Sequence, residues 1–319
     1  MRMTRRQWLL GAGGVALLSG GVVRFRFQGS MDTAERRISG RSQIIPSKHG
    51  KLEYAVAGSG APLLMVHGTG GGFDQGLSFA AALQRRGNRV IAPSRFGYLR
   101  SEFPADPSLA NQADAFVTLL DFLRIDHLPV IGGSAGALSA TAFALRHPDR
   151  CTALVLLVPA ANVSGSDPVE MTPLQQKAVR VLLNSDFAYW SALRMAPNQL
   201  IGTLLATNPS LLSTVSPSER KRAFAILSNI LPVSARTAGM LNDARQAGHP
   251  AKVDFSRLMP PLLIISAEDD RFGTAATARR IAAVVPNAEL IVLPDGGHIW
   301  LGHDEFVAER IQAFIRRSR

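Results

Sequence analysis

Cysteine is almost missing from this chain of 319 residues. The single thiol, Cys151, excludes an intrachain disulfide, and with it the small secreted domains that depend on disulfide staples. Internal repeats and low-complexity tracts are missing as well, which excludes repeat architectures. The hydrophobic share of 46% is that of an ordinary globular protein. We therefore expect one large domain with an insertion, whose core needs no staples and buries Cys151 as a small apolar side chain.

Signatures of nucleotide and metal sites are also lacking. No G-K-[ST] follows the glycine-rich stretch near residue 70, as a phosphate-binding loop requires. No G-x-G-x-x-G opens the first strand-to-helix turn, as a dinucleotide site requires. The His, Cys, Asp and Glu residues form no cluster at the spacing of metal ligands. We therefore expect neither a cofactor nor a metal.

Positive charge is in excess, but it is not gathered into a patch. The formal net charge is +11, and residues 1–37 hold seven arginines against two acidic residues. After residue 40 there is no compact run of Lys and Arg with interleaved aromatic residues, as a nucleic-acid site would favour. We therefore expect no nucleic-acid partner and attribute the excess charge to solubility and a targeting segment.

The N-terminus has the layout of an export signal, a charged start followed by a short apolar segment. Arg5 and Arg6 precede the weakly apolar stretch Trp8–Val23, and TRRQWLL resembles the twin-arginine signal of folded exported proteins. The stretch is short for a spanning helix, and no Ala-x-Ala cleavage site follows it. We expect residues 1–40 to lie outside the fold, as an export signal or as an N-terminal membrane anchor. The protein itself is then expected in the periplasm or another extracytoplasmic location. A disordered basic N-terminus is the alternative.

Apolar runs of strand length alternate with helical patterns along most of the chain. This alternation predicts an α/β fold with a mostly parallel sheet and helices on both of its faces. Residues 161–257 break the alternation with helical patterns and contain no run typical of a central strand. We expect a core of residues 41–160 and 258–319 and a helical cap at 161–257. Ligands of such sheets bind at the carboxyl ends of the strands, so the cap is a candidate lid.

A candidate nucleophile lies in the stretch Gly132-Gly133-Ser134-Ala135-Gly136, which fits the pattern G-x-S-x-G. An apolar strand precedes it and an alanine-rich helix follows, which is the context that this pattern requires. The sharp turn strains the serine backbone, so its neighbours must be small. The hydroxyl is then held away from the sheet, near a helix N-terminus that favours negative charge.

A serine nucleophile needs a base, and the base needs an orienting acid. LLIISAEDDRFG ends an apolar strand with Asp269 and Asp270, and LPDGGHIWLGH places His298 after the next strand. Both loops follow strands, so we expect them at the edge of the sheet that carries Ser134. We predict His298 as the base and Asp270, deeper in its loop, as the acid. Asp269 is the alternative acid.

An oxyanion hole is predicted beside the nucleophile. VHGTGGG, residues 66–72, follows a strand, and its successive glycines expose backbone N–H groups. A tetrahedral intermediate needs such donors for its developing oxyanion. We predict the N–H of Ala135 as one donor and that of Thr69 or Gly70 as the other. His67 is expected to fix the loop by hydrogen bonding.

These motifs together resemble the lid-bearing α/β-hydrolase superfamily. VHGTGGG, VIAPSRFGYLRS, VIGGSAGAL, LLIISAEDDRFG and LPDGGHIWLGH stand in the order of that family, over residues 42–160 and 258–319. The resemblance implies an eight-stranded, mostly parallel sheet, a Ser-Asp-His triad and a helical cap. The chain departs from the family pattern at Ser94, where an Asp is frequent, and at Ala267, where a glycine is usual.

The nucleophile narrows the reaction. Relatives that cleave haloalkanes or epoxides carry an aspartate at this position, whereas this chain has Ser134. We expect hydrolysis of an ester-type bond (carboxylester, lactone or thioester) in a small acyl substrate through an acyl-enzyme on Ser134. A carbon–carbon bond hydrolase of the same fold is one alternative. Those enzymes often carry a tryptophan soon after the histidine, and Trp300 stands nearby at a different offset. A non-catalytic small-molecule binding protein is the other alternative.

The cap also offers candidate substrate-binding residues. DFAYWSALRMAPNQL contains Tyr189, Trp190 and Arg194, which could form an apolar wall and a polar contact over the substrate. The alternative is that this amphipathic helix only packs against the sheet domain.

Overall fold

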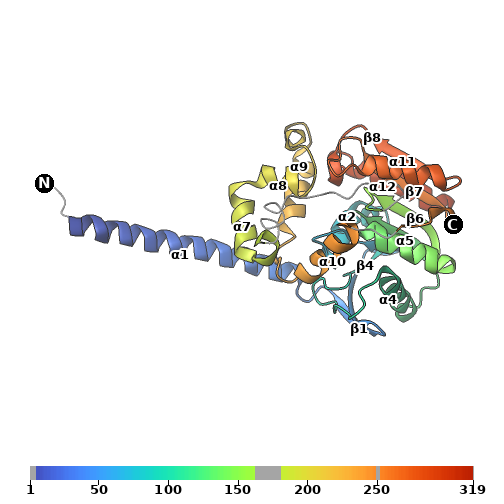
Figure 1. Cartoon of the computed structure of the whole chain (residues 1–319), viewed down its shortest axis with the longest axis horizontal. Coiled ribbons are helices and arrows are strands. Elements are labelled where there is room, and N and C mark those ends of the chain that lie inside the picture. The colour runs from blue at the N-terminus through green and yellow to red at the C-terminus, as the bar shows by residue number, and fades with distance from the viewer. Residues whose placement is uncertain (1–4, 162–180, 249–251, 319) are drawn as a thin grey trace.

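An eight-stranded sheet forms the centre of the computed structural model, which describes residues 5–161, 181–248 and 252–318 (Figure 1). The strand order is β1-β2-β4-β3-β5-β6-β7-β8. β2 pairs antiparallel with β1 and with β4, and every pair from β4 to β8 is parallel. The predicted α/β fold is confirmed. The strands are β1 (Gln43–Ser47), β2 (Gly50–Ala57), β3 (Ala61–Val66), β4 (Asn88–Pro93), β5 (Leu128–Gly133), β6 (Cys151–Leu157), β7 (Leu262–Ala267) and β8 (Glu289–Leu293).

The central strands are apolar throughout because helices cover both faces of the sheet. Every residue of β5 and β7 is buried. One core contains side chains of α4, α5 and α11, and the core on the opposite face contains those of α3 and α12. The helices of this sheet domain are α2 (Phe73–Phe79), α3 (Ala81–Arg85), α4 (Leu109–Phe122), α5 (Gly136–Arg146), α11 (Thr274–Val284) and α12 (Asp304–Arg317).

The segment between β6 and β7 is helical in the part that the structure describes. Its helices form a layer beside the sheet domain (Figure 1). All of these helices except the last share an apolar cluster with Ile299 and Leu301 of the loop that follows β8, which ties the layer to the carboxyl end of the sheet. Residues 162–180 and 249–251 of the predicted cap lie outside the described residues. The helices are α7 (Asp186–Met195), α8 (Pro197–Thr203), α9 (Pro217–Ser228) and α10 (Thr237–Gly248).

A long N-terminal helix, α1 (Arg5–Ile38), begins far from the other elements and ends against them (Figure 1). The ring of Phe27 meets the ring of Trp190 edge-on, with 5.6 Å between centroids. Ala34 is buried in the same cluster. Near the end of the helix, the guanidinium of Arg37 donates to Asp74 at 3.2 Å and to the carbonyl of Asn229 at 2.9 Å.

The exclusion of residues 1–40 from the fold is therefore wrong for residues 27–38. Apolar side chains of these residues pack against α7. Arg37 also forms an ion pair with the buried Asp74. Composition pointed to a separate segment because the charged and apolar residues before residue 27 dominate this stretch. None of the described helices combines the length and the hydropathy that crossing a bilayer requires.

Asp74 of α2 forms ion pairs that join the sheet domain to both the insert and α1. Arg236, which is fully buried, donates to it at 2.9 Å, and Arg37 donates to it at 3.2 Å. Burial alone would raise the pKa of Asp74, but the two guanidinium groups outweigh it and lower that pKa below 3.8.

Asp74→Asn should therefore lower the free energy of unfolding at pH 7 by about 3–5 kcal/mol, because Arg236 is left buried without its counter-charge. The carboxylate stabilises the fold fully above its unfolded-state pKa of 3.8, and this contribution is lost as the pH falls through the lower folded-state pKa. The difference between wild type and variant should hence shrink below pH 4. Urea unfolding of both proteins at pH 7 and pH 3 measures it.

The exposed pair of Glu289 and Arg317 offers a matched control. Glu289→Gln removes one carboxylate whose partner stays in water, so its unfolding midpoint should match that of the wild type. Equal midpoints for Asp74→Asn and wild type at pH 7 would show that the buried charges contribute nothing.

Candidate active site

Ser134 occupies a left-handed turn between β5 and α5, with φ of +52°. Its small neighbours are required by close packing. A Cβ atom at Gly136 would lie 2.4 Å from the carbonyl oxygens of Val66 and His67, and one at Gly132 would lie 2.7 Å from the Cβ of Ala140. The turn therefore brings the backbone of β3 and that of α5 together, and it leaves the hydroxyl at the carboxyl end of the sheet.

The side chains of Ser134, His298 and Asp270 form one continuous hydrogen-bonded relay. The Nε2 of His298 lies 2.8 Å from the Oγ of Ser134, and its Nδ1 lies 2.8 Å from the Oδ2 of Asp270. Asp270 follows β7, and His298 lies in the short 3-10 turn Gly297–Ile299 after β8. The Asp270 carboxylate is fully buried, so it fixes the proton of the imidazole on Nδ1 and turns the lone pair of Nε2 toward the serine.

The two neighbouring aspartates have different tasks. Asp270 also accepts from the backbone N–H of Phe272 at 2.9 Å and from the hydroxyl of Thr274. Asp269 instead accepts from the backbone N–H of Gly297 at 2.8 Å and so holds the turn that carries His298. The geometry favours Asp270 as the orienting acid.

Two residues of this loop were missed in the sequence. Thr274 begins α11 and links Asp270 to Ser266 of β7 through hydroxyl contacts. The ring of Phe272 meets the imidazole of His298 edge-on, with 4.8 Å between centroids, and Phe272 is 46% exposed. Thr274 lies four residues after Asp270, at the start of a helix. This spacing could have predicted that its hydroxyl donates a hydrogen bond to the Asp270 carboxylate.

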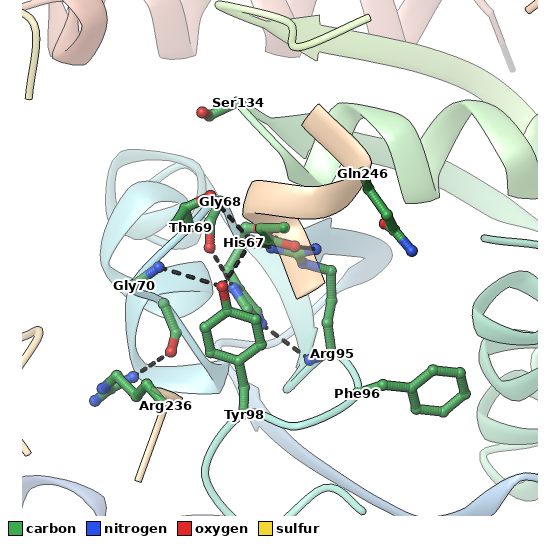
Figure 2. Close-up of polar contacts among 12 residues, drawn as sticks. His67, Gly68, Thr69, Gly70, Arg95, Phe96, Tyr98, Ser134, Arg236 and Gln246 are labelled. Atoms are coloured by element: carbon green, nitrogen blue, oxygen red, sulfur yellow. Dashed lines mark hydrogen bonds and ion pairs between the residues drawn. The ribbon is translucent and has the colours of Figure 1, made fainter. Parts of the chain in front are cut away.

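The glycine-rich loop after β3 lies directly beside the nucleophile (Figure 2). A Cβ atom built on Gly68 would be 3.1 Å from that of Ser134. Among the described residues, no hydrogen bond engages the N–H of Thr69 or that of Ala135. The N–H of Gly70 donates to the hydroxyl of Tyr98 at 3.4 Å. Of the two donors predicted in this loop, Thr69 is thus the unoccupied one.

His67 holds the base of the loop. Its Nε2 accepts from the N–H of Arg95 at 2.9 Å, and its Nδ1 lies 2.7 Å from the carbonyl of Gly68. Burial, together with the nearby charge of Arg95, holds the pKa of His67 well below 6.5. The imidazole is neutral at pH 7, with its proton on Nδ1, and it serves as a structural connector.

Ser94, which stands where relatives often have an aspartate, is buried and fully bonded. Its hydroxyl donates to a carboxylate oxygen of Glu53 at 2.9 Å and accepts from the N–H of Phe73 at 3.0 Å. Glu53 of β2 thus supplies the negative charge that the loop residue lacks. An acidic residue between Leu52 and Tyr54, in the buried part of β2, is the signal that could have identified Glu53.

The candidate substrate-binding residues of the cap make packing contacts. The hydroxyl of Tyr189 donates to the carbonyl of Leu227 at 2.9 Å, and the indole N–H of Trp190 donates to Ser30 of α1 at 3.0 Å. Arg194 stacks over the ring of Trp190 at 5.8 Å. These contacts face α9 and α1, and none of them reaches the loop of Ser134.

The sequence profile of the family described as "alpha/beta hydrolase fold" matches residues 61–302. The chain therefore belongs to this family and is a hydrolase, and the resemblance inferred from its motifs is confirmed.

Individual relatives agree with the family. A 2-hydroxymuconate semialdehyde hydrolase from Pseudomonas putida is 29% identical over 271 residues, covering 82% of this chain and 89% of that protein. An alpha/beta hydrolase fold protein from Nakamurella multipartita superposes with a TM-score of 0.69 at 25% identity, covering 87% of this chain and 100% of the other. An esterase from Exiguobacterium antarcticum shares the fold, with a TM-score of 0.65 at 21% identity over 86% of this chain and 99% of its own.

The different contacts of the two aspartates can be tested by isosteric amides. Asp270→Asn should lower kcat by about 10⁴-fold, because an amide can hold the imidazole in the wrong tautomer. Asp269→Asn retains an oxygen that accepts from Gly297, so its kcat should fall by no more than about tenfold. Steady-state hydrolysis of a chromogenic substrate measures both variants, and the reverse order of losses would assign the acid to Asp269.

Proposed function

We propose that this hydrolase cleaves ester-type bonds of small acyl substrates through an acyl-enzyme on Ser134. The hydroxyl oxygen attacks the carbonyl carbon while Nε2 of His298 takes its proton. The N–H groups of Thr69 and Ala135 stabilise the oxyanion of the tetrahedral intermediate. Its collapse releases the alcohol or thiol, to which His298 returns the proton. Water, deprotonated by His298, then attacks the acyl group and restores the free serine. Asp270 holds the imidazole and stabilises its protonated form.

The observation that carries this proposal is the relay itself. Two contacts of 2.8 Å join the serine, the imidazole and the buried carboxylate in one line. Within the described part of the chain, the backbone N–H groups of Thr69 and Ala135 have no hydrogen-bond acceptor. A small-molecule binding protein without catalysis would have no need of a strained serine backbone aligned with a base.

Carbon–carbon bond hydrolysis is the second candidate, and the 29% identity to 2-hydroxymuconate semialdehyde hydrolase supports it. The tryptophan that favoured carbon–carbon bond hydrolysis, Trp300, makes structural contacts. Trp300 packs against the ring of Phe79 at 5.3 Å, and its indole N–H donates to Asp304 at 3.2 Å. Its side chain is thus committed to the core beneath the site.

Short-chain p-nitrophenyl esters, a lactone, a thioester and 2-hydroxymuconate semialdehyde should separate the two reactions. We expect turnover of at least one ester-type substrate in excess of the semialdehyde. Ser134→Ala should lower that turnover by at least about 10⁴-fold, because it removes the hydroxyl that Nε2 of His298 contacts.

Two histidines, five residues apart, provide the control. His298→Gln should be as inactive as Ser134→Ala, whereas His303→Gln removes only a contact with the exposed Asp295 and should keep wild-type turnover. Equal ester turnover in wild type and Ser134→Ala would end the proposal. Turnover confined to the semialdehyde would replace it with the carbon–carbon reaction.

We also propose that the start of the chain directs export, with membrane association through Trp8–Val23 as a further step. The support is the pair Arg5 and Arg6 before an apolar stretch, as twin-arginine signals have. Exposed Val22 and Phe25 continue the apolar character of the helix up to the point at which it packs on the insert. Any removable signal would have to end before the packed residues 27–38.

Arg5→Lys combined with Arg6→Lys should trap the protein in the cytoplasm, because the twin-arginine pathway discriminates between these two residues while the net charge is unchanged. Arg24→Lys combined with Arg26→Lys is the control and should be exported normally. Cell fractionation with immunodetection measures both, and wild-type distribution of the first variant would exclude this route.

A further inference from the structure

Helix α10 of the insert places a buried carboxylate, Asp243, directly behind the glycine-rich loop. We propose that Asp243 is a positioning residue of the oxyanion hole, which holds the N–H of Thr69 in the direction that the tetrahedral intermediate requires. The proposal rests on the proposed acyl transfer at Ser134.

Three residues donate four hydrogen bonds to this one carboxylate. Its Oδ1 accepts from Nη1 of Arg95 at 2.7 Å. Its Oδ2 accepts from Nη2 of Arg95 at 2.6 Å, from the hydroxyl of Tyr98 at 2.6 Å and from the hydroxyl of Thr69 at 2.9 Å. Asp243 and Arg95 are almost completely buried, with side-chain exposures of 3% and 4%. A bidentate pair of this kind has little freedom to shift.

Each donor is also tied to a different part of the loop, as Figure 2 shows for Tyr98 and Arg95. Tyr98 accepts from the N–H of Gly70 at 3.4 Å, and Nε of Arg95 donates to the carbonyl of His67 at 3.0 Å. Thr69 lies between these two anchors and is bound to Asp243 by its own side chain. The peptide that carries the free N–H is therefore fixed from both sides and at its centre.

The charge of Asp243 is neutralised, so it does not repel the oxyanion that forms beside the loop. A lone carboxylate behind the hole would oppose the oxyanion, but Arg95 compensates it within 3 Å. Burial and the neighbouring Asp243 raise the pKa of Tyr98 well above 10.0, so its hydroxyl keeps its proton and remains a donor. Asp243 thus orients the loop through hydrogen bonds without adding net charge.

The test compares Asp243→Asn, Thr69→Val and the double variant on the ester that the wild type turns over. An amide presents N–H to donors that need an acceptor, and valine removes the hydroxyl but keeps the backbone N–H. We expect kcat to fall about tenfold to hundredfold in each single variant, with KM changed by less than about twofold, since the donor acts in the transition state. The double variant should lose no more than the more impaired single variant, because both act through one contact.

An inhibitor separates positioning from general damage to the fold. A phenylboronic acid forms a tetrahedral adduct on the serine, so its inhibition constant should rise in parallel with the loss of kcat. Thr69→Ser returns the hydroxyl and should recover at least about fivefold of the kcat lost in Thr69→Val. If Asp243→Asn does not fold, Thr69→Val and Thr69→Ser decide the question by themselves.

Asp114 provides the matched control. It is also a buried aspartate, but it belongs to α4, and its basic partners Lys48, Arg146 (at 2.7 Å) and His147 lie outside the glycine-rich loop. Asp114→Asn should lower the unfolding temperature and leave kcat per folded molecule unchanged.

Unchanged kcat and inhibition constants in Thr69→Val would overturn the positioning role of Asp243, while the proposed ester hydrolysis would stand. A wild type without Ser134-dependent ester turnover would instead overturn the proposed function.

Discussion

The whole site depends on one backbone conformation, the left-handed turn at Ser134. A non-glycine residue in this region costs about 1–2 kcal/mol, so the surrounding structure must impose it. The N–H of Ser134 donates to the carbonyl of Leu157 at 2.9 Å, and its own carbonyl accepts from the N–H groups of Ala137 and Ala160 at 3.0 and 3.1 Å. Strand β6, the loop that follows it and helix α5 therefore fix the serine before any side chain takes part.

A second constraint concerns the loop beside that turn. With four glycines in residues 66–72, it has few side chains to pack, so hydrogen bonds must define its shape. Asp243 of the insert pairs with Arg95 of the core, and Arg236 of the insert pairs with Asp74 while donating to the carbonyl of Gly71. Each pair joins opposite charges from the two parts of the chain. The insert is therefore bound to the sheet domain by the same contacts that shape the loop.

Local patterns predicted what depends on local chemistry. The apolar strands, the turn of Ser134 and the order of acid and histidine could all be predicted, because each needs a short run of suitable residues at a strand end. The choice between Thr69 and Gly70 could not, since it depends on the hydroxyl of Tyr98, nearly thirty residues further along the chain. Asp243 was missed for the same reason, because its partners Thr69, Arg95 and Tyr98 lie about 145 or more residues earlier in the chain.

In the N-terminal helix, one contact with a distant residue changes the interpretation of the whole segment 1–40. Residues 1–40 have the composition of a targeting sequence, yet Arg37 shares Asp74 with Arg236 and so belongs to the charge group next to the loop. A helix rises about 1.5 Å per residue, so the four residues from Val23 to Phe27 span only about 6 Å. The apolar stretch and the packed part of the helix are thus separated by about one turn of α1. A membrane contact of the apolar stretch would hold the insert, and the loop bound to it, close to the bilayer surface.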